Sequence, residues 1–157
     1  MAGRNLHPLL KGLLMFLVFA GTAVLFWQHY ENSLTKIQNK QSLWDQTKTL
    51  TPAQKEIIYQ YGQFLRKNYG YKLIIKITNE RVYLPRLDKR TIFIGLSPRH
   101  YQVFVTLPPI LEKALGVQFV HYLQTEYFKD YFAQDKWPQR LLNCLKLIQK
   151  RIEQIAG

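Results

Sequence analysis

The chain has 157 residues, 14% of them aromatic, and its 22 Lys and Arg residues against 10 Asp and Glu residues give a formal net charge of +12. The aromatic content argues against a largely disordered chain, and the single cysteine, Cys144, excludes an internal disulfide and a cysteine-rich metal site. The positive charge favours anionic partners, which include phospholipid headgroups, acidic proteins and nucleic acids.

One uninterrupted apolar run, LLMFLVFAGTAVLFW, follows a basic N-terminal stretch that contains Arg4 and Lys11. With its flanking residues, the run approaches the roughly 20 residues that span about 30 Å of hydrocarbon. We therefore predict a cytoplasmic tail over residues 1–11 and a transmembrane helix over residues 12–30. Trp27 is expected in the far headgroup layer.

Small residues within this run, Gly21, Thr22 and Ala23, offer a face for packing against a neighbouring helix. A cleaved secretory signal is the alternative interpretation, since Ala20 and Ala23 are small enough for a signal peptidase. The apolar run continues past both positions, which favours an uncleaved anchor. The predicted localisation is a single-pass inner (cytoplasmic) membrane protein, with its N-terminus inside and its C-terminal domain periplasmic or lumenal.

Residues 31–50 are mainly polar, and we interpret them as a linker or a helix extension. The folded domain is predicted over residues 51–157. Its first helix, over residues 52–69, has Thr51 as its N-cap and Gly70 as its left-handed stop.

Three strands are predicted next. Residues 71–78 alternate in polarity, which indicates a strand with at least one buried side. Residues 79–90 contain a proline and mixed charge and are expected to form mainly loop. Strands over residues 91–96 and 101–107 are joined by the turn residues 97–100, which predicts a hairpin.

Helices complete the predicted domain. Pro108 and Pro109 open a helical region that Gly116 interrupts, and an aromatic-rich helix face then ends near Phe132. A last helix begins near Pro138 and carries apolar residues at spacings of three and four. The order predicts a small sheet covered by helices, in the α/β or α+β class.

This layout resembles the TPM domain, a small α/β/α domain of bacterial membrane-anchored or secreted proteins and of thylakoid lumen proteins. The resemblance covers about residues 50–155. It is carried by Leu50-Thr51-Pro52 opening a helix, the strand at 72–77, the paired strands at 91–96 and 102–107, and the segment 131–137. The resemblance implies an α/β/α sandwich with a few-stranded sheet covered by helices. Together with the helix predicted from the apolar run, the predicted fold class is α/β, with one N-terminal transmembrane helix before the sandwich. The resemblance also implies a role in maintaining membrane complexes, including photosynthetic ones.

The chain departs from the family where the family carries its turn motifs. Asp88-Lys89-Arg90-Thr91 stands where an Asp-Asn-Gly-like entry is usual, and two prolines replace a glycine-rich turn after the third strand. Those prolines remove two amide donors. Of the oxygen ligands that a hard cation needs, only Asp88 and Glu112 remain nearby. We therefore expect no metal and no cofactor, and we name Asp88 and Glu112 as the ligands if a metal site is retained.

No complete catalytic motif occurs in the sequence. Ser97 is interpreted as a turn residue, Cys144 as a packed residue on the last helix and His121 as a side chain without a ligand role. Residues 92–97 are similar to the shorter motif of RNA-recognition domains, but the longer aromatic motif is absent, so nucleic acid is not expected as a partner.

The strongest surface signal is a basic stretch from residue 72 to residue 99, in which seven cations outnumber Glu80 and Asp88. These cations are Lys72, Lys76, Arg81, Arg86, Lys89, Arg90 and Arg99. One interpretation is a solvated basic face with no dedicated partner. The more specific interpretation is a surface that contacts anionic lipid or an acidic subunit.

The predicted function is a non-catalytic accessory, assembly or stabilising subunit of a larger membrane protein complex, with integral membrane subunits as partners. One alternative is a weak metal-dependent phosphatase of the TPM type. The other is a peripheral module that binds anionic phospholipid headgroups.

Overall fold

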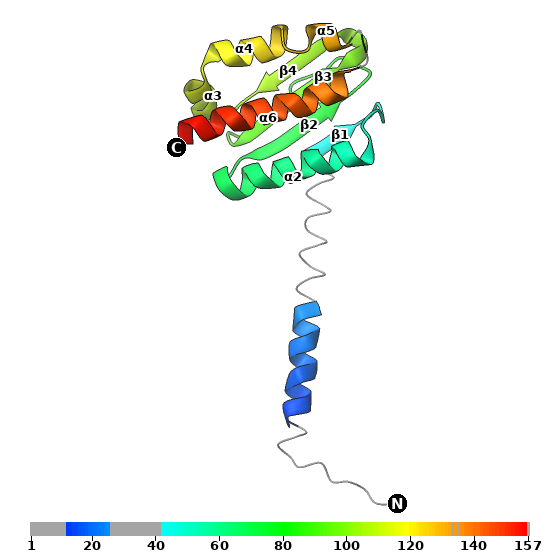
Figure 1. Cartoon of the computed structure of the whole chain (residues 1–157), viewed down its shortest axis with the longest axis vertical. Coiled ribbons are helices and arrows are strands. Elements are labelled where there is room, and N and C mark those ends of the chain that lie inside the picture. Colours follow the sequence, from blue (N-terminus) through cyan, green and yellow to red (C-terminus); the bar gives the residue numbers. More distant parts are fainter. Residues whose placement is uncertain (1–11, 26–41, 133, 135, 157) are drawn as a thin grey trace, which may run out of the picture. The chain divides into compact units, whose positions relative to one another are not determined.

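The structure is a computed structural model that describes residues 12–25, 42–132, 134 and 136–156 (Figure 1). The chain divides into two compact units, Met1–Gln38 and Asn39–Gly157, which are described separately below.

The first unit contains a helix over residues 12–25, which includes the exposed residues Gly21, Thr22 and Ala23. Across the described ranges, no helix has both the length and the apolar character needed to cross a membrane. The predicted transmembrane helix over 12–30 is therefore wrong, as are the fold class and the single-pass inner-membrane localisation that included it. Trp27 lies outside the described residues.

The second unit is a mixed α/β fold with a four-stranded sheet. Its elements in chain order are β1 (Leu43–Asp45), α2 (Pro52–Tyr69), β2 (Lys72–Ile77), β3 (Thr91–Ser97), a 3-10 turn η1 (Pro98–His100), β4 (Gln102–Thr106), α3 (Pro109–Leu115), α4 (Val117–Thr125), α5 (Lys129–Phe132) and α6 (Trp137–Ala156).

The strands lie in the order β1-β2-β3-β4, with the first three parallel and β4 antiparallel to β3. The predicted hairpin is therefore confirmed as β3 and β4. Strand β1 was not predicted, because it is three residues long and lies in the stretch interpreted as a linker. It adds a parallel edge strand whose Leu43 pairs with Ile75 of β2.

Helix α2 begins and ends as predicted. The Thr51 side chain accepts a hydrogen bond from the Gln54 amide, and the Gln54 side chain accepts one from the Thr51 amide. These two bonds form a capping box that satisfies free donors of the first turn. Gly70 ends the helix at φ 70°, a left-handed conformation that glycine adopts at little cost.

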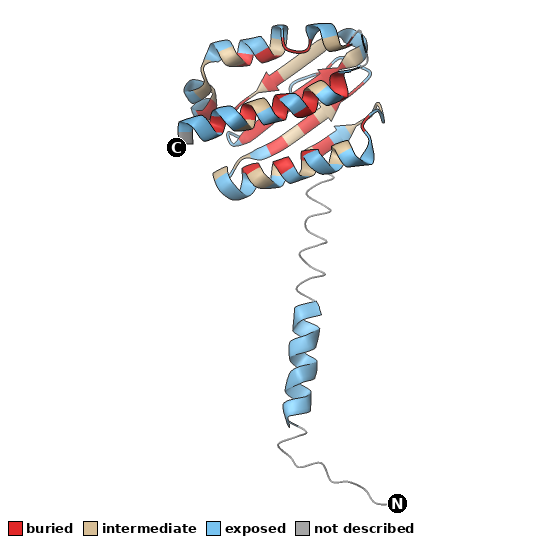
Figure 2. Cartoon of the chain, in the orientation of Figure 1, coloured by how far each residue is buried: buried red, intermediate tan, exposed pale blue. Residues whose placement is uncertain are grey.

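The core lies against one face of the sheet, which we call the helix-covered face. The strands supply Leu73, Ile75, Ile77, Ile92, Ile94, Leu96 and Val105 to a single buried cluster. Every α-helix of this unit contributes to the same cluster, including Leu65 of α2, Leu123 of α4 and Leu141 of α6. Figure 2 shows this burial along the sheet and the facing sides of α2 and α6.

The opposite face of the sheet carries no helix within the described part of the chain. Its central residues are Phe93 and Gly95 of β3; Phe93 is fully buried, and Val82 of the segment 79–90 covers Gly95. The predicted α/β/α sandwich is therefore corrected to helices on one face and an extended segment on the other. The physical reason is that residues 79–90 cross from β2 to β3 without forming a helix.

Candidate functional site

The face of the sheet without helices mixes cations with exposed aromatic side chains. In the strand register, Trp44 of β1 pairs with Lys76 of β2, and Lys76 pairs with Gly95 of β3. These residues therefore form one row across this face, because paired residues of neighbouring strands point to the same side. Trp44 is 68% exposed, although it belongs to a residue type that usually buries most of its surface.

The segment 79–90 lies over this face and is held there by two contacts. The Val82 amide donates a hydrogen bond of 2.9 Å to the Gln102 side-chain oxygen on β4. The Val82 side chain lies so close to Gly95 that a Cβ atom at position 95 would come within 2.5 Å of Val82 Cγ1. A glycine at position 95 therefore makes room for the segment.

The next two residues of the segment, Tyr83 and Leu84, are 75% and 54% exposed. The chain then returns to the start of β3, where the Lys72 amide donates a hydrogen bond of 2.9 Å to the Arg90 carbonyl. This bond joins the end of the segment to the start of β2. We define the basic face as Trp44, Lys72, Lys76, Arg81, Tyr83, Leu84, Arg86 and Lys89.

Five of the seven predicted cations belong to the basic face, and Arg90 and Arg99 do not. The Arg90 guanidinium lies near Gly70 at the end of α2, and Arg99 lies in η1, after the C-terminal end of β3. None of the five cations forms an ion pair with a described carboxylate. Four of the five are exposed, and Lys76 is half-buried beside Trp44. Their charge is therefore free to act on a partner.

By contrast, the carboxylate of Asp45 on the helix-covered side is fully paired. It lies 3.2 Å from Lys55 Nζ and accepts hydrogen bonds from the Thr47 hydroxyl and from the Lys48 and Leu50 amides. Burial raises the pKa of Asp45, but the bonds from Thr47, Lys55 and Leu50 and the Lys55 charge outweigh burial and leave that pKa below its usual value.

The two predicted metal ligands come from the loop before β3 and from α3 after β4. Asp88 is exposed, and its backbone carbonyl accepts the Thr91 amide. Glu112 lies in the first turn of α3, and its carbonyl accepts the Gly116 amide. No group of three or more His, Cys, Asp or Glu side chains that could hold a metal ion occurs among the residues that the structure describes.

The structure also places the other residues that were considered as candidates in the sequence: Cys144, Ser97 and His121. Cys144 is fully buried in the core cluster, and burial raises the pKa of its thiol to about 12, so its predicted packing role is confirmed. Ser97 ends β3, where its hydroxyl is buried without a hydrogen-bond partner in the described structure. His121 is exposed on α4.

The contact that joins α6 to the residues before it was not predicted from the sequence. The Arg140 guanidinium lies 3.7 Å from the Tyr127 ring centroid and 4.2 Å from that of Tyr131, and its Nε donates to the Tyr127 carbonyl. Such stacking on two rings favours arginine over lysine. The sequence showed the spacing of the aromatic residues, but it did not show that the Arg140 side chain stacks on two of them.

The fold, a four-stranded mixed sheet with helices on one face, can be compared with known proteins. The sequence matches no family model, and no curated protein matches it. The structure is similar to the solution NMR structure of the N-terminal domain of a protein from P. gingivalis, with a TM-score of 0.63 and 11% sequence identity. The match covers 76% of this chain and 87% of that one. At this identity the likeness establishes the fold alone.

Proposed function

We propose that this chain carries a TPM-like domain that acts as a non-catalytic accessory subunit of a larger protein complex. Its basic face binds an acidic surface of a partner protein. The observation that carries this proposal is the basic face itself, which combines five cations without ion pairs and three exposed apolar or aromatic side chains.

The exposed side chains favour a protein partner over a diffuse ionic contact. Aromatic residues and arginine are enriched where protein interfaces bind most tightly, because they bury large areas at low entropic cost. Trp44 and Tyr83 offer such anchors, and Lys76 is paired with Trp44 in the strand register. The surrounding cations would select an acidic partner and accelerate its association.

A single-stranded nucleic acid fits this face less well. Nucleic acids bind open sheets by stacking bases on aromatic side chains of the central strands. Here the central strand β3 presents Phe93 to this face, and Phe93 is fully buried. Val82 covers the neighbouring Gly95, so the centre of the face is closed to a base.

The proposal can be tested with the full chain and a fluorescent 20-residue peptide in which glutamates alternate with leucine and phenylalanine. We expect saturable binding that weakens as salt rises, because ionic contacts are screened. Trp44→Ala should weaken binding about fivefold at constant charge, as expected for an interface anchor worth about 1 kcal/mol. Fluorescence anisotropy measures both effects.

The matched control is Lys146→Gln with Lys150→Gln, which removes two exposed charges from α6. The test pair is Lys76→Gln with Arg81→Gln. If both pairs weaken binding equally, or if Trp44→Ala has no effect, the basic face is not the binding surface. Preferential binding to phosphatidylglycerol vesicles or to an oligo-dT strand would also overturn the proposal in favour of a lipid or nucleic-acid partner.

A further inference from the structure

A depression of about 500 Å³ lies where the three parallel strands end, away from the residues of the basic face. Its walls come from the residues that follow β1, β2 and β3, together with α5 and the start of α6. The lining residues are Thr47, Thr49, Asn79, Pro98, Arg99, Tyr101, Phe132 and Trp137. Ligand sites in open α/β sheets form at this carboxyl edge, because loops from adjacent strands converge there.

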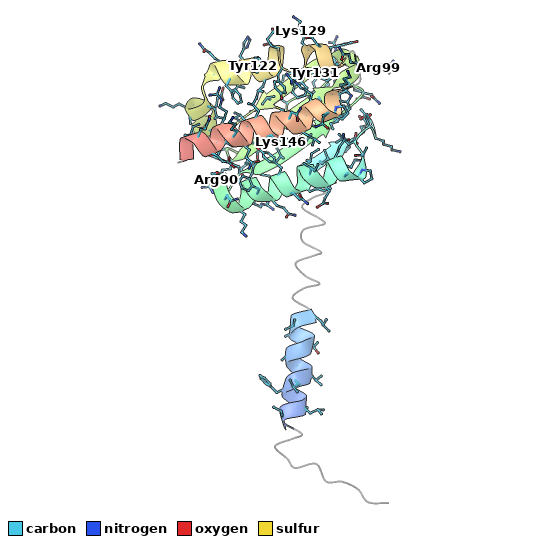
Figure 3. All side chains as sticks on the ribbon, viewed as in Figure 1. Arg90, Arg99, Tyr122, Lys129, Tyr131 and Lys146 are labelled. Carbon is cyan, nitrogen blue, oxygen red and sulfur yellow. The ribbon has the colours of Figure 1, made fainter. Side chains whose placement is uncertain are left out.

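One side of the depression is polar and has free hydrogen-bond donors. The Thr47 hydroxyl is engaged, since it donates to Asp45 at 2.8 Å. The Thr49 hydroxyl, the Asn79 amide and the Arg99 guanidinium have no hydrogen-bond or ion-pair partner in the described structure. The one cation of the lining is Arg99, and Figure 3 labels it at this end of the unit.

The other side is aromatic. Phe132 and Trp137 are 5% and 2% exposed and form a floor. Tyr101 is 63% exposed and stands edge-on to Phe132, with ring centroids 6.2 Å apart and planes at 88°. A flat apolar group placed against Tyr101 would bury surface that the chain leaves in water.

The backbone on both sides of the depression is held in an uncommon conformation. Lys48, between the two lining threonines, has φ 56°, and Tyr101 has φ 52°. These are the two described non-glycine residues with positive φ. Lys48 lies in a turn where its amide donates to Asp45, and Tyr101 ends η1, so these conformations fix the course of the two loops beside the depression.

We propose that the depression binds a monocarboxylate carried on an aromatic or apolar body. Arg99 receives the carboxylate through its paired N–H donors, with Thr49 and Asn79 as further donors, and Tyr101 packs against the body. A single guanidinium matches one negative charge, which favours a carboxylate over a phosphate dianion. This site is independent of the proposed function, because it shares no residue with the basic face.

The test uses the full chain, benzoate as the probe and benzyl alcohol as its uncharged counterpart, with amide chemical shifts followed by NMR. Benzoate should bind with a Kd of about 1 mM, as suits a nine-atom fragment, and should shift the amides of Thr49, Asn79 and Arg99. Arg99→Gln should weaken binding about tenfold. Arg66→Gln, which removes another exposed charge, from α2, should leave it unchanged.

Tyr101→Gly separates binding from folding, because glycine tolerates φ 52° while the ring is lost. We expect this variant to keep its unfolding midpoint and to lose most benzoate affinity. Equal losses in Arg99→Gln and Arg66→Gln would overturn the proposal, as would equal binding of benzyl alcohol. Tenfold tighter binding of phenyl phosphate would overturn the choice of a carboxylate.

Discussion

The two faces of the sheet differ in what covers them. On the helix-covered face, the strands present aliphatic side chains that are almost completely buried beneath α2, α4 and α6. On the basic face, one extended segment places Val82 over Gly95, while Trp44, Tyr83 and the surrounding cations stay accessible. The same strands therefore supply stability from one side, where burial is complete, and a recognition surface from the other, where it is not.

The largest expected difference between the two faces is in the loss of stability when an isoleucine is truncated to alanine. Ile75→Ala removes a fully buried side chain from the helix-covered face and should lower the free energy of unfolding by about 3 kcal/mol. Ile74→Ala, one residue earlier on the half-buried opposite side, should cost about 1 kcal/mol. Urea unfolding measures both changes, and equal costs would contradict the division between the faces.

A smaller effect is expected where the segment 79–90 meets β3. Gly95→Ala places a methyl group against Val82 Cγ1 and should destabilise the fold by about 2 kcal/mol through overpacking. Val82→Ala in the same chain should restore part of this loss, because it removes the clashing atom. A double-mutant cycle by thermal unfolding measures the coupling, and strictly additive effects would show that Val82 does not cover Gly95.

The smallest of these effects concerns the paired charge beside the helix-covered face. The folded-state pKa of Asp45 lies below its unfolded value, so its stabilising contribution is present above about pH 4 and is lost as pH falls through the folded pKa. We expect this contribution to be on the order of 1 kcal/mol. Unfolding midpoints measured down to pH 2 should fall less steeply for Asp45→Asn than for the unchanged chain.

Local patterns in the sequence predicted the elements that depend on local physics. The Thr51 cap and Gly70 stop delimit α2, and the alternation in β2 and the turn before β4 define their strands. The sequence did not predict β1, because three residues carry too little periodicity. It also did not predict the covering of the second face, because a single valine in a charged loop gives no signal of what it packs against.

The residues of the candidate sites could also be predicted only in part. The seven cations stood out by composition, but only the structure groups five of them and places Arg90 and Arg99 elsewhere. The depression at the ends of the parallel strands is formed by loops that are distant in sequence, and no local sequence pattern predicts that such loops converge. The apolar run predicted a helix, confirmed over residues 12–25, but the membrane span inferred from it needed a longer apolar helix than the described residues provide.

Amide hydrogen exchange of the full chain, with and without the acidic peptide, distinguishes the basic face from the helix-covered face as the binding surface. Exchange should slow over residues 79–90 and around Trp44, with α2 and α6 unchanged. Protection confined to α4 or α6, with exchange over residues 79–90 unaltered, would contradict this prediction.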